Sequence, residues 1–320
     1  MSTDKPMGAG TLLRRTAIRD YGVYLALLLL IVVNVVITPN FLTGDNLRTQ
    51  LVQVVPTLVV ALGMALVIGT EGIDLSVGSV MAIAAALLPL YLGYGVVASI
   101  LVCLLAGALA GLLSGSLVTF AGVQPIVATL ALLVGGRGLA LVIANGPLKQ
   151  IDNPDLLALG SSSVIGIPLT VIVALALVIV VALLVERTTF GRQLVAVGGN
   201  RRAAEFAGLP VKRTLLTVYV LSGVFAAIAG VLASARLTAS DPSSLGLLIE
   251  LSAITAVVVG GTPLTGGRVR VIGTVAGALL MQLIAATLIK HDVPASVTQM
   301  LEAALIAAAV LLQRERRSGK

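Results

Sequence analysis

Residues 62–78, LGMALVIGTEGIDLSVG, place two carboxylates, Glu71 and Asp74, in the middle of an otherwise apolar run. A carboxylate at the centre of a bilayer costs roughly 2.5–3.5 kcal/mol, so two unpaired ones facing lipid would be strongly unfavourable. Glycines flank them, and glycine lets a backbone leave the helix and approach another chain closely. The stretch predicts a polar break between two membrane segments. The alternative is a plain turn between helices, with solvated carboxylates.

The composition of the whole chain is that of a membrane protein. Of its 320 residues, 58% are hydrophobic and only 11% charged, which exceeds the apolar content of an ordinary globular domain. The net charge is +7, but no basic run alternates with aromatic residues, so we expect no nucleic-acid partner. We predict an all-α fold, a polytopic transmembrane helical bundle in the lipid bilayer, with residues 1–320 as one domain.

Motifs for catalysis, metals and cofactors are not found. Cys103 lies alone in an apolar segment, and the single His291 cannot make a multi-histidine site. There is no Walker phosphate loop, nucleophile elbow or dinucleotide fingerprint. We therefore expect no metal, no cofactor and no catalytic site in this chain.

Apolar segments that could cross the membrane number about ten, given the roughly 20 residues that a span needs. They are 21–37, 51–69, 75–92, 95–120, 125–144, 164–185, 214–233, 250–260, 271–289 and 295–312. The segments 75–92 and 250–260 are short, so whether they cross fully stays open. Gly107, Gly111 and Gly115 follow at four-residue spacing in the fourth segment, which predicts a smooth face for a neighbouring helix.

The basic residues predict the orientation of the bundle. Four lie in the N-terminal arm (1–20), six in 186–213, two in 261–270 and four in the tail (313–320), together 16 of the 21 in the chain. Because basic residues gather in cytoplasmic loops, both termini and the loop 186–213 are expected in the cytoplasm. Five spans in each half would make the halves an inverted 5+5 repeat.

Several motifs resemble those of a known family. GIDLSVGS at 72–79, Q-P-x-V-A-T-L at 124–130 and E-L-x-A-I-x-A-V-V-x-G-G-x-x-L-x-G-G at 250–267 are similar to motifs in the membrane permeases of ATP-driven bacterial sugar importers of the ribose, xylose, arabinose, galactose and galactofuranose group. The resemblance covers roughly 51–312. Most members carry a second glycine where this chain has Glu71, which leaves the role of Glu71 open.

The polar segment 188–213 mixes basic and apolar side chains, which is unusual for a purely solvated loop. A short helix near 201–207 could dock in a groove of a partner, although the segment could also pack back on its own bundle. The resemblance implies that it contacts a cytoplasmic ATP-binding subunit. The coupling residues it implies are Phe190, Gly191, Arg192, Gly198, Gly199, Asn200, Arg201, Phe206 and Gly208.

A substrate path is expected near the polar residues of the spans. Its candidate residues are Asp74, Ser76, Gln124, Arg137 and Glu71. Arg137 is costly in a membrane unless it meets a carboxylate, carbonyls or water, and Asp74 and Glu71 are its candidate partners. It could instead fix the register of the helices or extend to the membrane surface. Glu250 is expected to cap a helix N-terminus.

Aromatic residues make up only 3% of the chain, with no tryptophan, so tight recognition of a sugar ring is not expected here. The resemblance implies an extracytoplasmic sugar-binding protein, an ATP-binding subunit and a second permease chain, identical or related, in the bacterial inner membrane. Two alternatives remain: a branched-chain amino-acid permease of an ATP-driven importer, and a secondary transporter that binds a coupling ion at Asp74 or Glu71. GIDLSVGS favours sugar over amino acid.

Overall fold

The computed structural model describes residues 9–146, 148–294, 296–297, 299–301, 303–304 and 307, with side chains from Tyr21 onward. Its helices are α1 (Ala9–Ile37), α2 (Gly44–Gly69), α3 (Val77–Tyr91), α4 (Val96–Thr119), α5 (Pro125–Ala144), α6 (Pro154–Ser161), α7 (Leu169–Arg187), α8 (Thr189–Gly199), α9 (Arg201–Phe206), α10 (Val211–Leu237), α11 (Ile249–Val259) and α12 (Val271–Lys290), with the 3-10 turn η1 (Leu92–Tyr94). Two antiparallel strand pairs join β1 (Lys149–Gln150) to β4 (Ala239–Ser240) and β2 (Ser163–Val164) to β3 (Ile167–Pro168).

Seven of the described helices are long and apolar enough to cross a membrane: α2, α3 with η1, α4, α5, α7, α10 and α12. The apolar part of α1, Tyr21–Ile37, and α11 are shorter. With 11 residues, α11 is about 16 Å long, which is too short to cross the hydrocarbon. The predicted span 295–312 lies largely outside the described residues. The prediction of a polytopic helical bundle is confirmed.

The predicted start of the sixth span is wrong. Hydropathy predicts a start at residue 164, whereas α7 begins at Leu169 and residues 163–168 form the β2–β3 hairpin. The chain turns back because Ile165 and Gly166 both adopt left-handed conformations, with φ of 52° and 79°. Hydropathy alone does not detect this turn, since its residues are as apolar as those of the span.

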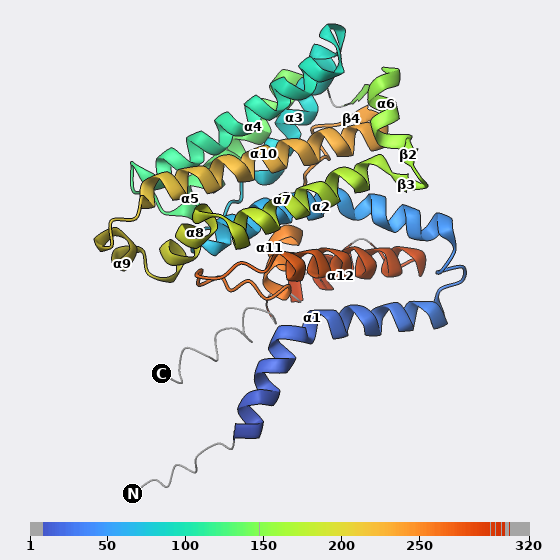
Figure 1. Cartoon of the computed structure of the whole chain (residues 1–320). Coiled ribbons are helices and arrows are strands. Elements are labelled where there is room, and N and C mark those ends of the chain that lie inside the picture. Colours follow the sequence, from blue (N-terminus) through green and yellow to red (C-terminus); the bar gives the residue numbers. More distant parts are fainter. Residues whose placement is uncertain are drawn as a thin grey trace, which may run out of the picture.

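The centre of the bundle is the packing of α2 against α10 (Figure 1). Each of these helices also packs on the opposite half of the chain: α2 on α11 and α12, and α10 on α3 and α4. Such an exchange of neighbours is what an inverted repeat with swapped central helices would give. In contrast, α1 lies at the edge of the bundle and packs on α12.

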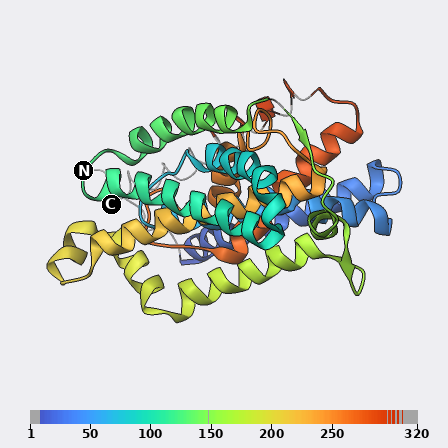
Figure 2. The same ribbon diagram turned by 90° about the horizontal axis from the view of Figure 1, so that it is seen from above.

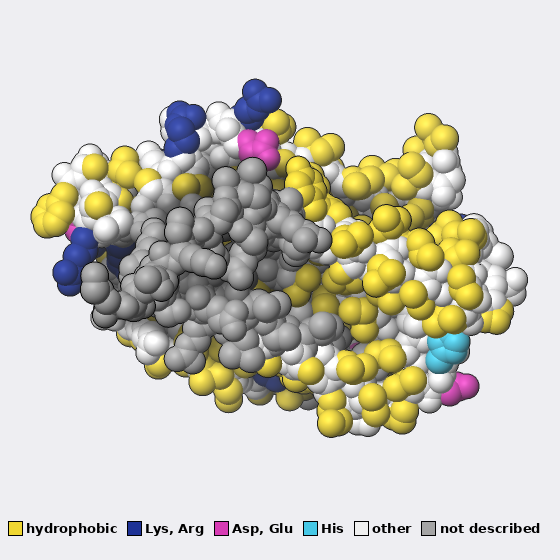
Figure 3. All heavy atoms as spheres, turned by 90° about the horizontal axis from the view of Figure 1, so that it is seen from below, with side chains coloured by type: hydrophobic (Ala, Val, Ile, Leu, Met, Phe, Trp, Pro, Cys, Tyr) yellow, Lys and Arg dark blue, Asp and Glu magenta, His cyan; other side chains and the backbone are white. Residues whose placement is uncertain are grey.

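The two ends of the bundle carry different structures (Figures 1 and 2). One end, called the α8 end here, carries α8 and α9 and the connections that follow α2, α4 and α11. The opposite end, the α6 end, carries α6, both strand pairs and the connection between α1 and α2. Figure 3 shows hydrophobic side chains over much of the described surface seen from below, with Lys and Arg toward one end and His at the other.

The outer helices present apolar side chains to their surroundings. Large exposed hydrophobic residues follow α4, α5 and α7, among them Leu101, Leu105, Val134, Val142 and Ile179. By contrast, every residue of α2 from Leu58 to Gly69 is buried. Because a soluble protein does not leave such continuous apolar faces uncovered, these faces of α4, α5 and α7 meet the lipid or a further protein chain.

The glycines of α4 bring it into close contact with α10, as their spacing predicted. A side chain on Gly107 would overlap the backbone of Gly223, and one on Gly111 would overlap the backbone of Tyr219. The two helices therefore touch through their backbones along this face.

A methyl group on α4 tests this contact. Gly111→Ala is expected to destabilise the protein by about 1–3 kcal/mol, because α4 must move away from α10. Gly135→Ala is the matched control, since Gly135 lies in the middle of α5 with open space around its Cα. Thermal unfolding of both variants in one detergent measures the difference. Equal midpoints would contradict the close contact.

Candidate functional site

The polar break predicted after α2 is present, and it begins with a defined helix end. The amide of Glu71 donates to the carbonyl of Ile68 at 2.9 Å, and that of Gly72 to the carbonyl of Val67 at 3.1 Å. This pair of hydrogen bonds is the Schellman motif, in which the residue at the position of Glu71 is left-handed and usually glycine. Glu71 has a φ of 65° and an exposed side chain.

Asp74 connects the break to α10. Its Oδ1 accepts hydrogen bonds from the backbone amide of Ser76 at 3.0 Å and the hydroxyl of Ser76 at 2.5 Å. Its Oδ2 accepts one from the Ser222 hydroxyl of α10 at 2.7 Å. Since the side chain of Asp74 is only 1% exposed, these bonds replace the water that a carboxylate would otherwise bind. They hold the break between α2 and α3 against the central helix α10.

Arg137 of α5 has other partners than Asp74 and Glu71. Its Nη1 donates to the carbonyls of Pro242 at 2.9 Å and Leu245 at 2.6 Å, and its Nη2 to the carbonyl of Gly78 at 3.5 Å. Arg137 thus joins α5 and the start of α3 to the segment before α11. The interpretation that it fixes the positions of helices agrees with this geometry.

Glu250 lies next to this junction, in the first turn of α11, as expected for a carboxylate at a helix N-terminus. It is 6% exposed, and it attracts the guanidinium of Arg137 electrostatically. A side chain on Gly78 would overlap both Glu250 and the backbone of Gly246. The N-termini of α3 and α11, one from each half of the chain, therefore meet at this point.

The five predicted path residues do not form one cluster. Asp74 and Ser76 bond to each other, whereas Glu71 and Gln124 are exposed near the α8 end. Gln124 precedes α5, and Arg137 lies about 20 Å further along that helix.

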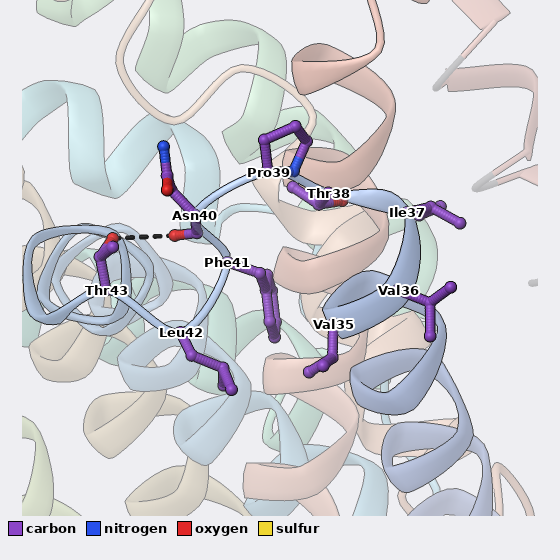
Figure 4. A pocket seen from close by; sticks show the side chains of 9 residues that line it. All are labelled: Val35, Val36, Ile37, Thr38, Pro39, Asn40, Phe41, Leu42 and Thr43. Carbon is purple, nitrogen blue, oxygen red and sulfur yellow. Dashed lines mark hydrogen bonds between the residues drawn. The ribbon is translucent and has the colours of Figure 1, made fainter.

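A hollow of about 540 Å³ lies elsewhere, at the α6 end (Figure 4). One stretch of chain, residues 35–43, lines it, and Thr43 bonds to the carbonyl of Asn40 at 2.8 Å within it. Because its lining comes only from the end of α1 and the α1–α2 connection, without convergent polar groups from other elements, we do not assign it as a substrate site.

The helices α8 and α9 begin where the sequence supplies side-chain caps. The Thr188 hydroxyl accepts a hydrogen bond from the Gly191 amide at 3.3 Å, and Asn200 Oδ1 accepts one from the Ala203 amide at 3.0 Å. The predicted coupling residues divide into two groups. Gly191 and Gly198 are buried and Phe190 is half-buried. The exposed group is Arg192, Gly199, Asn200, Arg201, Phe206 and Gly208.

The buried glycines hold α8 directly on the bundle. A side chain on Gly198 would overlap the carbonyl of Gly69, the last residue of α2, and would lie 2.6 Å from the amide of Gly267. That amide donates to the same Gly69 carbonyl at 3.0 Å. The backbones of α8, α2 and the α11–α12 connection thus meet at one joint, made by Gly69, Gly198 and Gly267. Only a few residues separate this joint from Asp74.

The sequence interpretation missed some of the polar residues. Ser222 donates a hydrogen bond to Asp74, but nothing in the sequence distinguishes it from the other serines of the apolar segments. Gln50 and Gln53 of α2 accept hydrogen bonds from Gln282 of α12 at 3.2 and 2.9 Å. The spacing of Gln50 and Gln53, three residues apart in a span, could have indicated a shared helix face.

The fold is that of a multi-pass membrane protein: a helical bundle with a break pinned by a buried carboxylate and a pair of short helices at one end. The chain belongs to the branched-chain amino acid transport system / permease component family, whose model matches residues 46–310.

Three relatives illustrate the similarity. The galactofuranose transporter permease protein YtfT of Escherichia coli (strain K12) is 39% identical over 91% of this chain and 88% of its own. The fructose import permease protein FruF of Bifidobacterium longum (strain NCC 2705) is 38% identical over 83% and 77%. The ribose import permease protein RbsC of Escherichia coli (strain K12) is 36% identical over 91% and 92%.

Removing the charge of Asp74 tests its role. Asp74→Asn keeps the size but weakens charge-assisted hydrogen bonds worth roughly 1.5–3 kcal/mol each, so we expect assembly to persist with impaired transport. Asp74→Leu should reduce expression, because Ser76 and Ser222 lose their acceptor. Ser222→Ala should impair transport to a similar extent as Asp74→Asn. The loss of stability in the double variant should be smaller than the sum of the losses in the two single variants. Fully additive losses would contradict a direct bond.

Glycine at position 71 should fit the helix end better than glutamate does. Glu71→Gly relieves the left-handed strain and is expected to raise stability by up to about 1 kcal/mol, with transport retained. Glu71→Ala, which keeps the strain but removes the carboxylate, is the control. If both variants lost transport completely, the carboxylate itself would have a role beyond the helix end.

Proposed function

We propose that this chain is the membrane permease of an ATP-driven monosaccharide importer and forms the translocation path by alternating access. The support comes from relatives that match most of the chain: permease proteins of galactofuranose transport, fructose import and ribose import. The family description names branched-chain amino acids, but these relatives at 36–39% identity favour a sugar. ATP hydrolysis takes place on a separate subunit.

The observation that carries the coupling proposal is the exposed face of α8 and α9. Phe206 is 91% exposed at the end of α9, and Arg201 and Arg202 of the same short helix are exposed as well. Aromatic residues and arginine are both enriched in protein interfaces, so an exposed aromatic side chain on a short helix with exposed arginines fits a docking surface. This face binds the cytoplasmic ATP-binding subunit. The other interpretation, a loop packed back on its own bundle, fits only the buried side of α8.

The glycine joint transmits movement from the exposed face of α8 and α9 to the membrane-spanning helices. Movement of α8 shifts the Gly69 carbonyl without an intervening side chain, and α2 leads at once into the break held by Asp74. Because packed helices shift as rigid elements, a displacement at α8 changes the position of α3 against α10. The path opens between α3, α5 and the segment before α11, where Arg137 and Glu250 lie.

The remaining assignments follow from orientation. Both termini and the α8 end lie in the cytoplasm, and the α6 end faces outward and receives the sugar-binding protein. A second permease chain, identical or related, completes the path on the exposed face of α5 or α4. The rival mechanism, an ion-coupled transporter using Asp74 or Glu71, is disfavoured because Asp74 already accepts three hydrogen bonds from Ser76 and Ser222.

A carboxylate introduced on the exposed face of α8 and α9 tests whether the ATP-binding subunit docks there. Phe206→Asp and Arg201→Asp are expected to abolish binding of the ATP-binding subunit and sugar-dependent ATP hydrolysis, because they remove an exposed aromatic side chain and a positive charge from this face. Phe120→Asp is the matched control, since Phe120 is also exposed at the α8 end, at 65%. Co-purification and ATPase measurement give the result. Normal stimulation by sugar in both test variants would place docking elsewhere.

A further inference from the structure

The β2–β3 hairpin at the α6 end exposes an apolar tip. Val164 is 51% exposed, Ile165 97% and Ile167 45%. Ile165 and Gly166 are the two central residues of the turn, and Ile165 is left-handed with a φ of 52°. Such turns favour Asn or Gly, and a β-branched residue is strained in this conformation. A residue that is both strained and exposed at a tip indicates a contact surface.

The base of the hairpin is fixed on the bundle. The amide of Leu169 donates to the carbonyl of Ser162 at 3.0 Å, and Arg48 of α2 donates to the carbonyl of Ser161 at 3.3 Å. Pro168, the last residue of β3, is buried. The base of the hairpin is therefore anchored to the bundle, and the tip projects from it.

The composition of the hairpin indicates a lipid partner. No charged residue occurs in 156–185, so the hairpin and the whole apolar length of α7 form one uncharged run. This is why hydropathy places residue 164 inside a span. Leu175 and Ile179 continue the exposed apolar surface along α7, at 49% and 58%. The tip thus extends a lipid-facing surface, whereas a soluble partner would usually meet a polar or charged rim.

The position of the hairpin agrees with this chemistry. Figures 1 and 2 place it at the outer end of α7, along the edge of the bundle, while the connection between α1 and α2 extends further out. A hairpin beside the helix ends is at the level where a bilayer changes from acyl chains to headgroups. A protein that docks on the α6 end from outside would meet the α1–α2 connection first.

We propose that the hairpin tip, residues 164–167, inserts into the boundary between headgroups and acyl chains and anchors the α6 end of α7 to the lipid. The insertion is shallow, because the backbone groups of Ile165 and Gly166 at the turn need headgroups or water as partners. This anchor is independent of the transported substrate and of the ATP-binding subunit.

A single tryptophan tests the anchor, because the chain has none of its own. The full chain carrying Ile165→Trp is placed in nanodiscs of phosphatidylcholine with and without brominated acyl chains. We expect blue-shifted emission, quenching of about twofold by the brominated lipid, and weak quenching by iodide, as for a tryptophan at the membrane interface. Val164→Trp serves as the second variant if tryptophan at the turn impairs folding.

Phe206→Trp is the reference for a water-exposed position in the same nanodiscs, since Phe206 is 91% exposed at the α8 end. The proposal is overturned if tryptophan at position 165 or 164 behaves like this reference, with red-shifted emission and full quenching by iodide. Protection from both brominated lipid and iodide would also overturn it, because it would show that protein covers the tip.

Discussion

The arrangement of the central helices depends on one constraint: the buried carboxylate of Asp74 needs hydrogen-bond donors. Asp74, almost completely buried, is held by Ser76 beside it and by Ser222 of α10. Unbonded, it would cost several kcal/mol, so the chain between α2 and α3 can take its irregular path only while α10 lies against it. One hydrogen-bonded cluster therefore holds the break that follows α2, and with it the start of α3, against α10.

The second half of the chain closes the arrangement through Arg137. Its guanidinium donates to carbonyls at the start of α3 and in the segment before α11 and lies near Glu250, so its partners do not include Asp74. The Asp74 cluster, the Arg137 hydrogen bonds and the joint of Gly69, Gly198 and Gly267 thus link α8, the break, α3 and the segment before α11.

Most of the fold could be predicted from the sequence, because long apolar runs and glycine spacing carry strong signals. The spacing of Gly107 and Gly111 predicted a close helix neighbour, and the structure identifies that neighbour as α10. The partners of Arg137 could not be predicted, because they include backbone carbonyls, which every residue has. The start of α7 was misplaced because the hairpin before it is as apolar as a span. Ser222 could not be recognised, as its role depends on which helix faces Asp74.

The most direct test of the account is uptake of labelled sugar by the permease in vesicles, reconstituted with its ATP-binding subunit and binding protein. The vesicles contain ATP, and ionophores dissipate the proton and sodium gradients. The account predicts that uptake persists without gradients and stops when ATP is replaced by a non-hydrolysable analogue. Uptake that collapses with the gradients at constant ATP would contradict it, and would make Asp74 or Glu71 the site of a coupling ion.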